Sequence, residues 1–242
     1  MTTPYDLQAG ELRRDGTRPF VTFYDDATGE RVELSVATFD NWVAKTAGLL
    51  RDGLSVEPGD RVALLLPPHW QSLVWAAACW ALGACVVLDR TDEVAVAVTG
   101  PSTLDAATTA GEVVALSLQP MGARFSAPLP AGVLDYAVEV PSYPDRIELA
   151  PPHPSEPAVD DVGAVQTLDG LVARATDRAA RLSIAAGARV LVTADHVRGA
   201  LNDALLLPLV VGGSSVLVRH ENPGRRDSRV AAERATAVAP TS

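Results

Sequence analysis

Two histidines stand at corresponding places in the sequence, each just after an apolar run that is typical of a buried strand. His69 follows Arg61–Pro68, and His196 follows Arg189–Ala194 with Asp195 between them. An imidazole can act as a general acid or base near neutral pH, or hydrogen-bond a carboxylate. His69, Asp195 and His196 could therefore support acyl-transfer or hydrolytic chemistry. The plainer interpretation of Asp195 and His196 is a capping pair at the start of a surface helix.

Other chemistry finds little support in the sequence. No two histidines have metal-ligand spacing, and neither a Gly-x-Ser-x-Gly elbow nor a Gly-x-x-x-x-Gly-Lys or Gly-x-Gly-x-x-Gly loop occurs. The two cysteines, Cys79 and Cys85, lie in apolar surroundings and are expected to be buried thiols. The sequence therefore predicts no metal site and no disulfide framework.

The elements that must position the histidines occur twice. Leu54–Val62 aligns with Leu182–Val190 at a constant offset of 128 residues, and Gly83–Leu88 aligns with Gly213–Val218 further on. Any two βαβ units share some of this pattern, but the matching Leu-Ser, Gly and Arg-Val positions favour a structural repeat. We therefore predict an α/β fold with two similar βαβ-containing lobes and mainly parallel sheets.

A crevice between the lobes is the expected binding site. Ligands of such sheets bind outside the carboxyl ends of the strands, here near residues 67–69 and 194–196. The expected strands are 19–24, 31–34, 61–66, 85–88, 94–98, 112–116, 189–193 and 215–218, and the expected helices are 35–53, 70–82, 104–109 (or a turn), 169–182 and 197–207.

Proline placement divides the chain. Six prolines lie between Pro141 and Pro157, so this stretch cannot sit inside a sheet or helix. We predict a first α/β lobe over 1–140, a Pro-rich linker or loop over 141–160, a second α/β lobe over 161–220 and a polar C-terminal tail over 221–242. Within the tail, Arg229–Val238 has helical character but no evident packing partner.

Charge and hydropathy exclude several classes of partner. The net charge is −10 over 242 residues, which argues against nucleic acid and anionic membranes. The N-terminus lacks a secretory signal, and the longest apolar run, Trp75–Leu82, is too short to span a bilayer. A cytoplasmic protein is expected.

Several segments resemble the N-terminal domain of AMP-forming acyl-CoA synthetases, members of the adenylate-forming ligase superfamily. These segments are Arg31–Ser35, the helix that ends at Gly53, Val56–Pro67, Trp80–Ala84 and Pro208–Gly213. His196–Gly199 is similar to the family's His-x-x-Gly, so the resemblance implies that His196 and Gly199 line an acyl pocket. It spans roughly residues 18–220, and a group of short actinobacterial proteins carries the same truncated pattern. ATP, AMP or CoA is implied as a ligand by this resemblance alone.

The departures from the family decide the functional expectation. The family holds ATP phosphates with a Ser/Thr/Gly-rich loop that ends in Pro-Lys-Gly, whereas Asp160–Leu171 contains one Thr, no Ser and no Lys. Carboxylates there would repel phosphate. The sequence also stops at Ser242, before the family's adenine-binding segments and the domain that supplies its catalytic Lys.

We therefore expect a degenerate acyl-CoA-synthetase-like domain, or pseudoenzyme. Such a domain would act as a binding or interaction module for a protein partner or for a small carboxylate or acyl ligand. Two alternatives stay open at this point. One is a ligase-related enzyme completed by a partner chain, and the other is an acyl-transfer or hydrolytic activity that uses His69 and His196.

Overall fold

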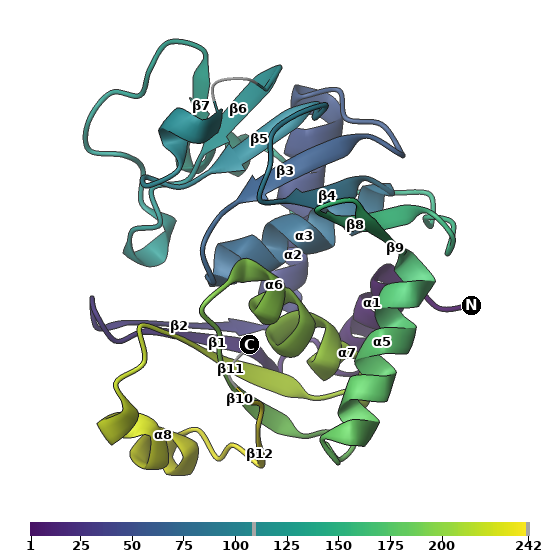
Figure 1. Ribbon diagram of the computed structural model, residues 1–242, viewed down its shortest axis with the longest axis vertical. Coiled ribbons are helices and arrows are strands. Elements are labelled where there is room, and N and C mark those ends of the chain that lie inside the picture. Colours follow the sequence, from purple (N-terminus) through teal and green to yellow (C-terminus); the bar gives the residue numbers. More distant parts are fainter. Residues whose placement is uncertain (108–109, 241–242) are drawn as a thin grey trace.

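Two sheets enclose a layer of helices (Figure 1). The computed structural model describes residues 1–107 and 110–240. One sheet has the order β12-β10-β11-β1-β2 and the other has the order β7-β6-β5-β3-β4-β8-β9. Among the described strands, only the pairs β1–β2 and β8–β9 are antiparallel. The predicted α/β fold with mainly parallel sheets is confirmed.

The strands of the first sheet are β1 (Pro19–Asp25), β2 (Glu30–Ser35), β10 (Arg189–Thr193), β11 (Ser214–Arg219) and β12 (Ala237–Val238). Those of the second sheet are β3 (Arg61–Leu65), β4 (Cys85–Leu88), β5 (Val96–Thr99), β6 (Glu112–Ala115), β7 (Val133–Asp135), β8 (Pro157–Asp161) and β9 (Ala164–Thr167). The α-helices are α1 (Pro4–Asp15), α2 (Val36–Gly48), α3 (Trp70–Leu82), α4 (Tyr136–Glu139), α5 (Leu168–Arg181), α6 (Val197–Ala200), α7 (Leu207–Val211) and α8 (Arg226–Ala232). Two π-helical turns, η1 (Leu49–Gly53) and η5 (Leu201–Leu206), extend this layer, and short 3₁₀ turns are η2 (Leu104–Ala107), η3 (Pro120–Gly122), η4 (Val140–Ser142) and η6 (Pro223–Arg225).

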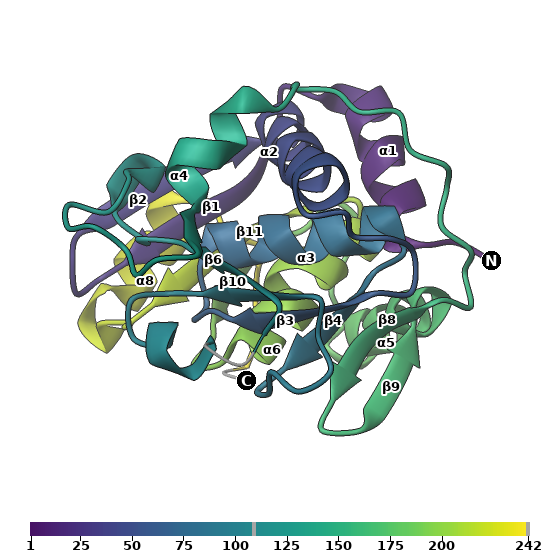
Figure 2. The same cartoon turned by 90° about the horizontal axis from the view of Figure 1, so that it is seen from above.

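Helix α3 lies at the centre of the molecule, between the two sheets (Figures 1 and 2). All of its residues are buried, as is typical of a helix whose own side chains are mostly apolar around its whole circumference. Its Trp80 indole donates to the carbonyl of Ala158 on β8 at 2.9 Å, which satisfies a polar group in the core. Helix α3 therefore joins the two sheets into one core.

The sequence repeat is also present in the backbone. Ser55 and Ser183 both adopt a positive φ, 55° and 53°, as do Gly59 and Gly187, 89° and 73°. Each of these glycines donates its N–H to the end of the following helical segment, at 2.8 and 2.7 Å. Shared left-handed positions and shared hydrogen bonds show that the two turns are built in the same way.

The downstream half of the sequence alignment needs a correction. Gly83 closes α3 in the left-handed conformation, and its counterpart in that role is Gly212, which closes α7, rather than Gly213. The second helical segment is longer and contains the wide π-helical turn η5, so the spacing between the repeats is not constant across it.

The strands are distributed between the sheets differently from the predicted lobe boundaries. Strands β1 and β2, from the first part of the chain, pair with β10 and β11, whereas β8 and β9 pair with β4. The stretch 141–160 contains the start of β8 and connects elements of a single sheet, so its unpaired part is a loop rather than a linker between the sheets. Residues 144–156, here called the crossing segment, run without helix or strand structure past α2 and α1 (Figure 2).

The predicted polar tail is packed against the first sheet. Instead of a helix over Arg229–Val238, α8 ends at Ala232 and β12 pairs with β10. The Arg229 guanidinium lies 4.6 Å from the Tyr24 ring centroid and donates to Asp26 at 2.5 Å. These charged contacts supply the packing partner that the sequence pattern did not reveal. The end of the predicted element 104–109 and the last two residues of the tail lie outside the described residues.

None of the described helices combines the length and apolar character needed to cross a membrane.

Candidate functional site

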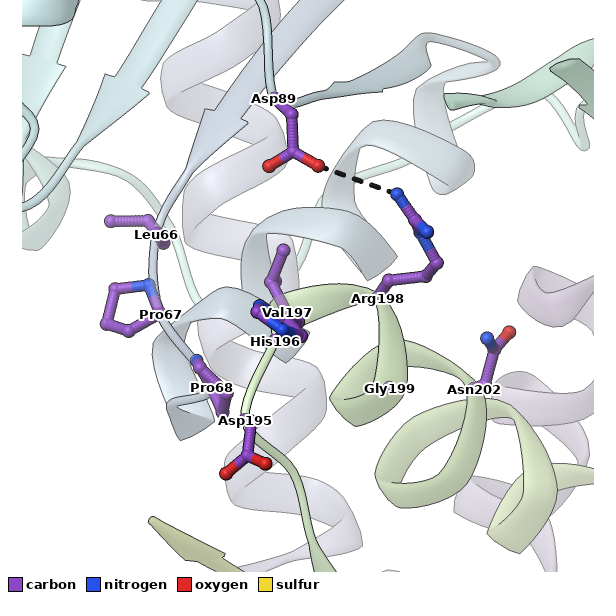
Figure 3. A pocket seen from close by; sticks show the side chains of 10 residues that line it. All are labelled: Leu66, Pro67, Pro68, Asp89, Asp195, His196, Val197, Arg198, Gly199 and Asn202. Atoms are coloured by element: carbon purple, nitrogen blue, oxygen red, sulfur yellow. Dashed lines mark hydrogen bonds and ion pairs between the residues drawn. The ribbon is translucent and has the colours of Figure 1, made fainter. Parts of the chain in front are cut away.

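A crevice of about 420 Å³ opens where β3 and β10 end, at the expected place. It is lined by Leu66, Pro67, Pro68, Asp89, Asp195, His196, Val197, Arg198, Gly199 and Asn202 (Figure 3). Three of the four residues singled out from the sequence, Asp195, His196 and Gly199, therefore lie together. The volume suits a small ligand.

His196 is available to a ligand in the crevice. It occupies the N-cap position of α6 in an extended conformation, but its side chain makes no capping hydrogen bond. Both Asp195 and His196 are exposed, whereas Gly199 is buried in the helix behind them. The imidazole thus keeps its hydrogen-bonding capacity for a molecule that enters the crevice.

His69 lies in the core and does not line the crevice. Its side chain is 1% exposed, and its Nδ1 accepts the N–H of Gln71 at 3.2 Å, which caps α3. The ring packs against Phe23, and Nε2 lies 4.0 Å from Glu30 Oε2. Burial lowers the pKa of His69. The structure therefore does not bring His69 and His196 into one catalytic centre.

Arg198 is a crevice residue that sequence reasoning did not single out. Its guanidinium forms ion pairs with Asp161 and, at 3.5 Å, with Asp89 (Figure 3). It occupies a variable position of the His-x-x-Gly motif, so its chain neighbours gave no signal. Only the pairing of β8 beside β4 brings both carboxylates to it.

The acidic segment predicted in place of a phosphate loop forms a tight hairpin. Strands β8 and β9 are joined by Val162 and Gly163, both at positive φ, 50° and 86°. Thr167 then caps α5 by accepting the N–H of Gly170 at 3.3 Å. Strand, turn, strand and helix thus follow each other with no residues left over for a longer loop.

The hairpin carboxylate Asp160 is fully engaged within the protein. It accepts from Arg61 at 2.7 Å, from the Gly163 N–H at 2.8 Å, and from Arg90. These donors, the Arg61 guanidinium foremost, lower the pKa of Asp160 although burial opposes them. Arg61 and Arg90 therefore already have a carboxylate partner within the protein.

Metal binding has no support in the described parts of the chain. Across residues 1–107 and 110–240, no group of three or more His, Cys, Asp and Glu side chains could hold an ion. Both cysteines are buried and unpaired, as expected, and burial raises the pKa of each thiol.

Known proteins share this architecture. The family model described as "AMP-binding enzyme" matches residues 10–92. The N-terminal domain of FACL13 from Mycobacterium tuberculosis superposes with a TM-score of 0.78 at 14% identity, covering 98% of this chain and 62% of that one. An acyl-CoA synthetase from Brucella canis gives 0.78 at 16% identity, covering 98% and 47%. The fold is that of the N-terminal domain of acyl-CoA synthetases, and the chain spans less than two thirds of either structure.

A relative in sequence places the chain more narrowly. The TIGR03089 family protein of Mycobacterium tuberculosis is 40% identical over 249 residues, covering 98% of this chain and all of that protein. The chain belongs to the TIGR03089 family.

Proposed function

We propose that this protein is a non-catalytic module that binds a small acyl or carboxylate ligand in the crevice without activating it with ATP. The observation that carries the proposal is the β8–β9 hairpin, whose two-residue turn stands where the family resemblance requires a phosphate-binding loop. A turn of this size offers too few backbone N–H groups to surround a triphosphate.

The charges around the crevice also disfavour a nucleotide. Asp89 and Asp195 line it, Asp161 lies beside it, and the Arg198 guanidinium is shared between Asp89 and Asp161. No lysine is among the lining residues of the crevice. A polyphosphate would meet more negative than positive charge, so the residues present do not fit ATP and we derive no adenylation step.

A small acyl ligand fits the same lining better. Leu66, Pro67 and Val197 form apolar contacts, while His196 and Asn202 offer hydrogen bonds to a carbonyl oxygen. A carboxylate would in addition draw Arg198 away from Asp161. The crevice thus favours an acyl group whose head accepts one or two hydrogen bonds.

Titration calorimetry with hexanoate and its neutral analogue hexanamide tests the binding, and a pyrophosphate-release assay with ATP·Mg²⁺ tests the absence of activation. We expect binding of the acyl probes that His196→Ala weakens by about tenfold, the loss of one side-chain hydrogen bond. We expect no pyrophosphate above background.

Pyrophosphate release by the purified chain, abolished by His196→Ala, would overturn the non-catalytic part of the proposal. No response to either acyl probe would overturn the ligand part and favour a protein partner instead.

A further inference from the structure

A second, larger cavity lies between α1, α2 and the crossing segment. Its volume is about 850 Å³, and it shares no lining residue with the crevice. Its walls come from α1, α2, the end of α3 and residues 146–149. We call it the α1–α2 cavity.

The walls of the α1–α2 cavity are mainly apolar and small. Helix α2 contributes Val43, Ala44 and Ala47, spaced three and four residues apart on one helix face. From the opposite side, Ile147 and Leu149 of the crossing segment are half-buried against the same core. Alanine side chains are too short to reach across, so the apolar walls lack contacts that a ligand would supply.

The crossing segment is held in place along α2. Lys45 donates to the carbonyl of Tyr143 at 2.6 Å and pairs with Asp145 at 2.9 Å, and Arg51 donates to the carbonyl of Glu148 at 3.1 Å. Contacts at both ends of residues 145–148 keep this wall from collapsing onto the helices. The cavity is therefore a built feature of the fold.

One carboxyl group belongs to the apolar face of α2 inside the cavity. Asp40 precedes Val43 and Ala44 by three and four residues, and its Oδ1 accepts from Gln8 on α1 at 2.8 Å. No described group donates to its Oδ2. Burial raises the pKa of Asp40, while the hydrogen bond from Gln8 and the charge of the exposed Arg146 oppose that shift.

We propose that the α1–α2 cavity binds an apolar primary amine, whose ammonium group pairs with the free oxygen of Asp40 and whose hydrocarbon part covers the alanine-lined wall. Asp40 has no described cationic side chain within ion-pair distance, and the ammonium group of the ligand would supply that partner. The net charge of −10 favours approach of cations over anions. The other charged groups of the cavity, Arg13, Arg146 and Glu148, are exposed, so they can move aside.

Calorimetric titration with hexylammonium near neutral pH tests this proposal. We expect binding that Asp40→Asn weakens by at least about tenfold, since a charge-assisted hydrogen bond is lost. Arg146→Gln should tighten binding, because Arg146 competes for the Asp40 charge. Asp227→Asn, on the exposed face of α8, removes one negative charge elsewhere and should leave the affinity unchanged.

Ala9→Leu provides a second variant if Asp40→Asn folds poorly. Ala9 lines the cavity from α1 and is only half-buried, so a larger side chain can fill the space and should abolish hexylammonium binding. Hexanoate binding that Arg146→Gln abolishes would show an anion site and overturn the proposal. No heat with hexylammonium would overturn it as well.

Discussion

Arg198 on α6 and Asp161 at the end of β8 form an ion pair beside the crevice, although α6 follows β10 of the first sheet and β8 belongs to the second. Asp89, which follows β4, lies 3.5 Å from the same guanidinium. One side chain therefore faces the ligand space and also connects α6 to the carboxyl end of the second sheet. Its two roles can be separated by experiment.

Arg198→Gln should weaken hexanoate binding by about tenfold and leave hexanamide binding nearly unchanged, because only the carboxylate gains from a guanidinium. The stability cost should stay below about 1 kcal/mol, since the Arg198 side chain is 48% exposed and its ion pairs are screened. Calorimetry and urea unfolding measure the two quantities. Arg181→Gln, on neighbouring α5, is the matched control, because Arg181 is exposed and does not line the crevice. Equal loss for both probes would contradict a carboxylate contact.

The ion pair between Arg178 and Asp203 should matter far more for stability. Asp203 is completely buried on η5, and Arg178 of α5 donates to both of its oxygens, with 2.6 Å from Nη2 to Oδ2. Arg178→Ala leaves the carboxylate without a partner and should cost about 3 kcal/mol in the free energy of unfolding.

Two matched variants isolate this effect. Arg181→Ala, one helical turn further on α5 and exposed, should change the free energy of unfolding by less than about 0.5 kcal/mol. The double variant Arg178→Met/Asp203→Leu should recover most of the loss, because no buried charge remains. A loss below about 1 kcal/mol for Arg178→Ala would show that water reaches Asp203.

His69 should make stability depend on pH below its ordinary pKa of 6.5. Burial lowers the pKa of the folded-state imidazole, with the nearby Glu30 acting in the opposite direction. Between the unfolded and folded pKa values the unfolded chain binds more protons, so stability is fully present above pH 6.5 and falls as the pH drops below it. His69→Asn keeps an acceptor for the Gln71 N–H but does not titrate. Urea midpoints at several pH values should therefore fall less steeply in the variant than in the wild type, and parallel curves would refute the assignment.

Local signals explain why much of the fold could be predicted. The glycines that close turns and helices, Gly59, Gly83 and Gly187, adopt the left-handed backbone that glycine favours, and each marks an element boundary. Helix α1 escaped prediction because few of its residues are apolar. Its start was nevertheless readable, since Thr3 and Asp6 form a capping box around Pro4.

Long-range pairing explains why the rest could not be predicted. Tyr24 donates to Glu233, and Arg31 and Arg189 pair with the same carboxylate. These contacts dock the C-terminal segment onto β1 and β2 across about two hundred residues of sequence. No periodicity or turn signal encodes such partners, and the parallel pairing of β1 with β11 is just as distant in sequence.

The candidate site, too, could be predicted from the sequence only in part. Strand repetition placed the crevice correctly, and Asp195, His196 and Gly199 line it. The symmetry argument failed for His69, because side-chain direction depends on local hydrogen bonds, and its Nδ1 turns back to cap α3. Arg198 could not be identified from the sequence, because its two carboxylate partners come together only through the pairing of β8 with β4. Sequence patterns therefore located the edge of the sheets and three of the residues that line the crevice, but not Arg198.

The turn between α7 and β11 should be the least tolerant point of the repeat. A Cβ built on Gly213 would lie 2.0 Å from the carbonyl oxygen of Ala188, which also accepts the N–H of Ser214 at 3.0 Å. Because the obstacle is backbone, it cannot rotate away, and Gly213→Ala should cost more than about 2 kcal/mol in the free energy of unfolding. Ala84 occupies the equivalent position before β4, so this close approach is specific to the second turn.

Gly10→Ala is the control for this change. Gly10 lies inside α1, and a Cβ there would meet nothing nearer than Arg13 Nη2 at 4.0 Å. The substitution should stabilise the protein by up to about 1 kcal/mol through helix propensity. Urea unfolding of both variants beside the wild type measures the contrast. If Gly213→Ala unfolds at the same urea concentration as the wild type, the second turn must be able to open, and its backbone contact with Ala188 does not fix the start of β11.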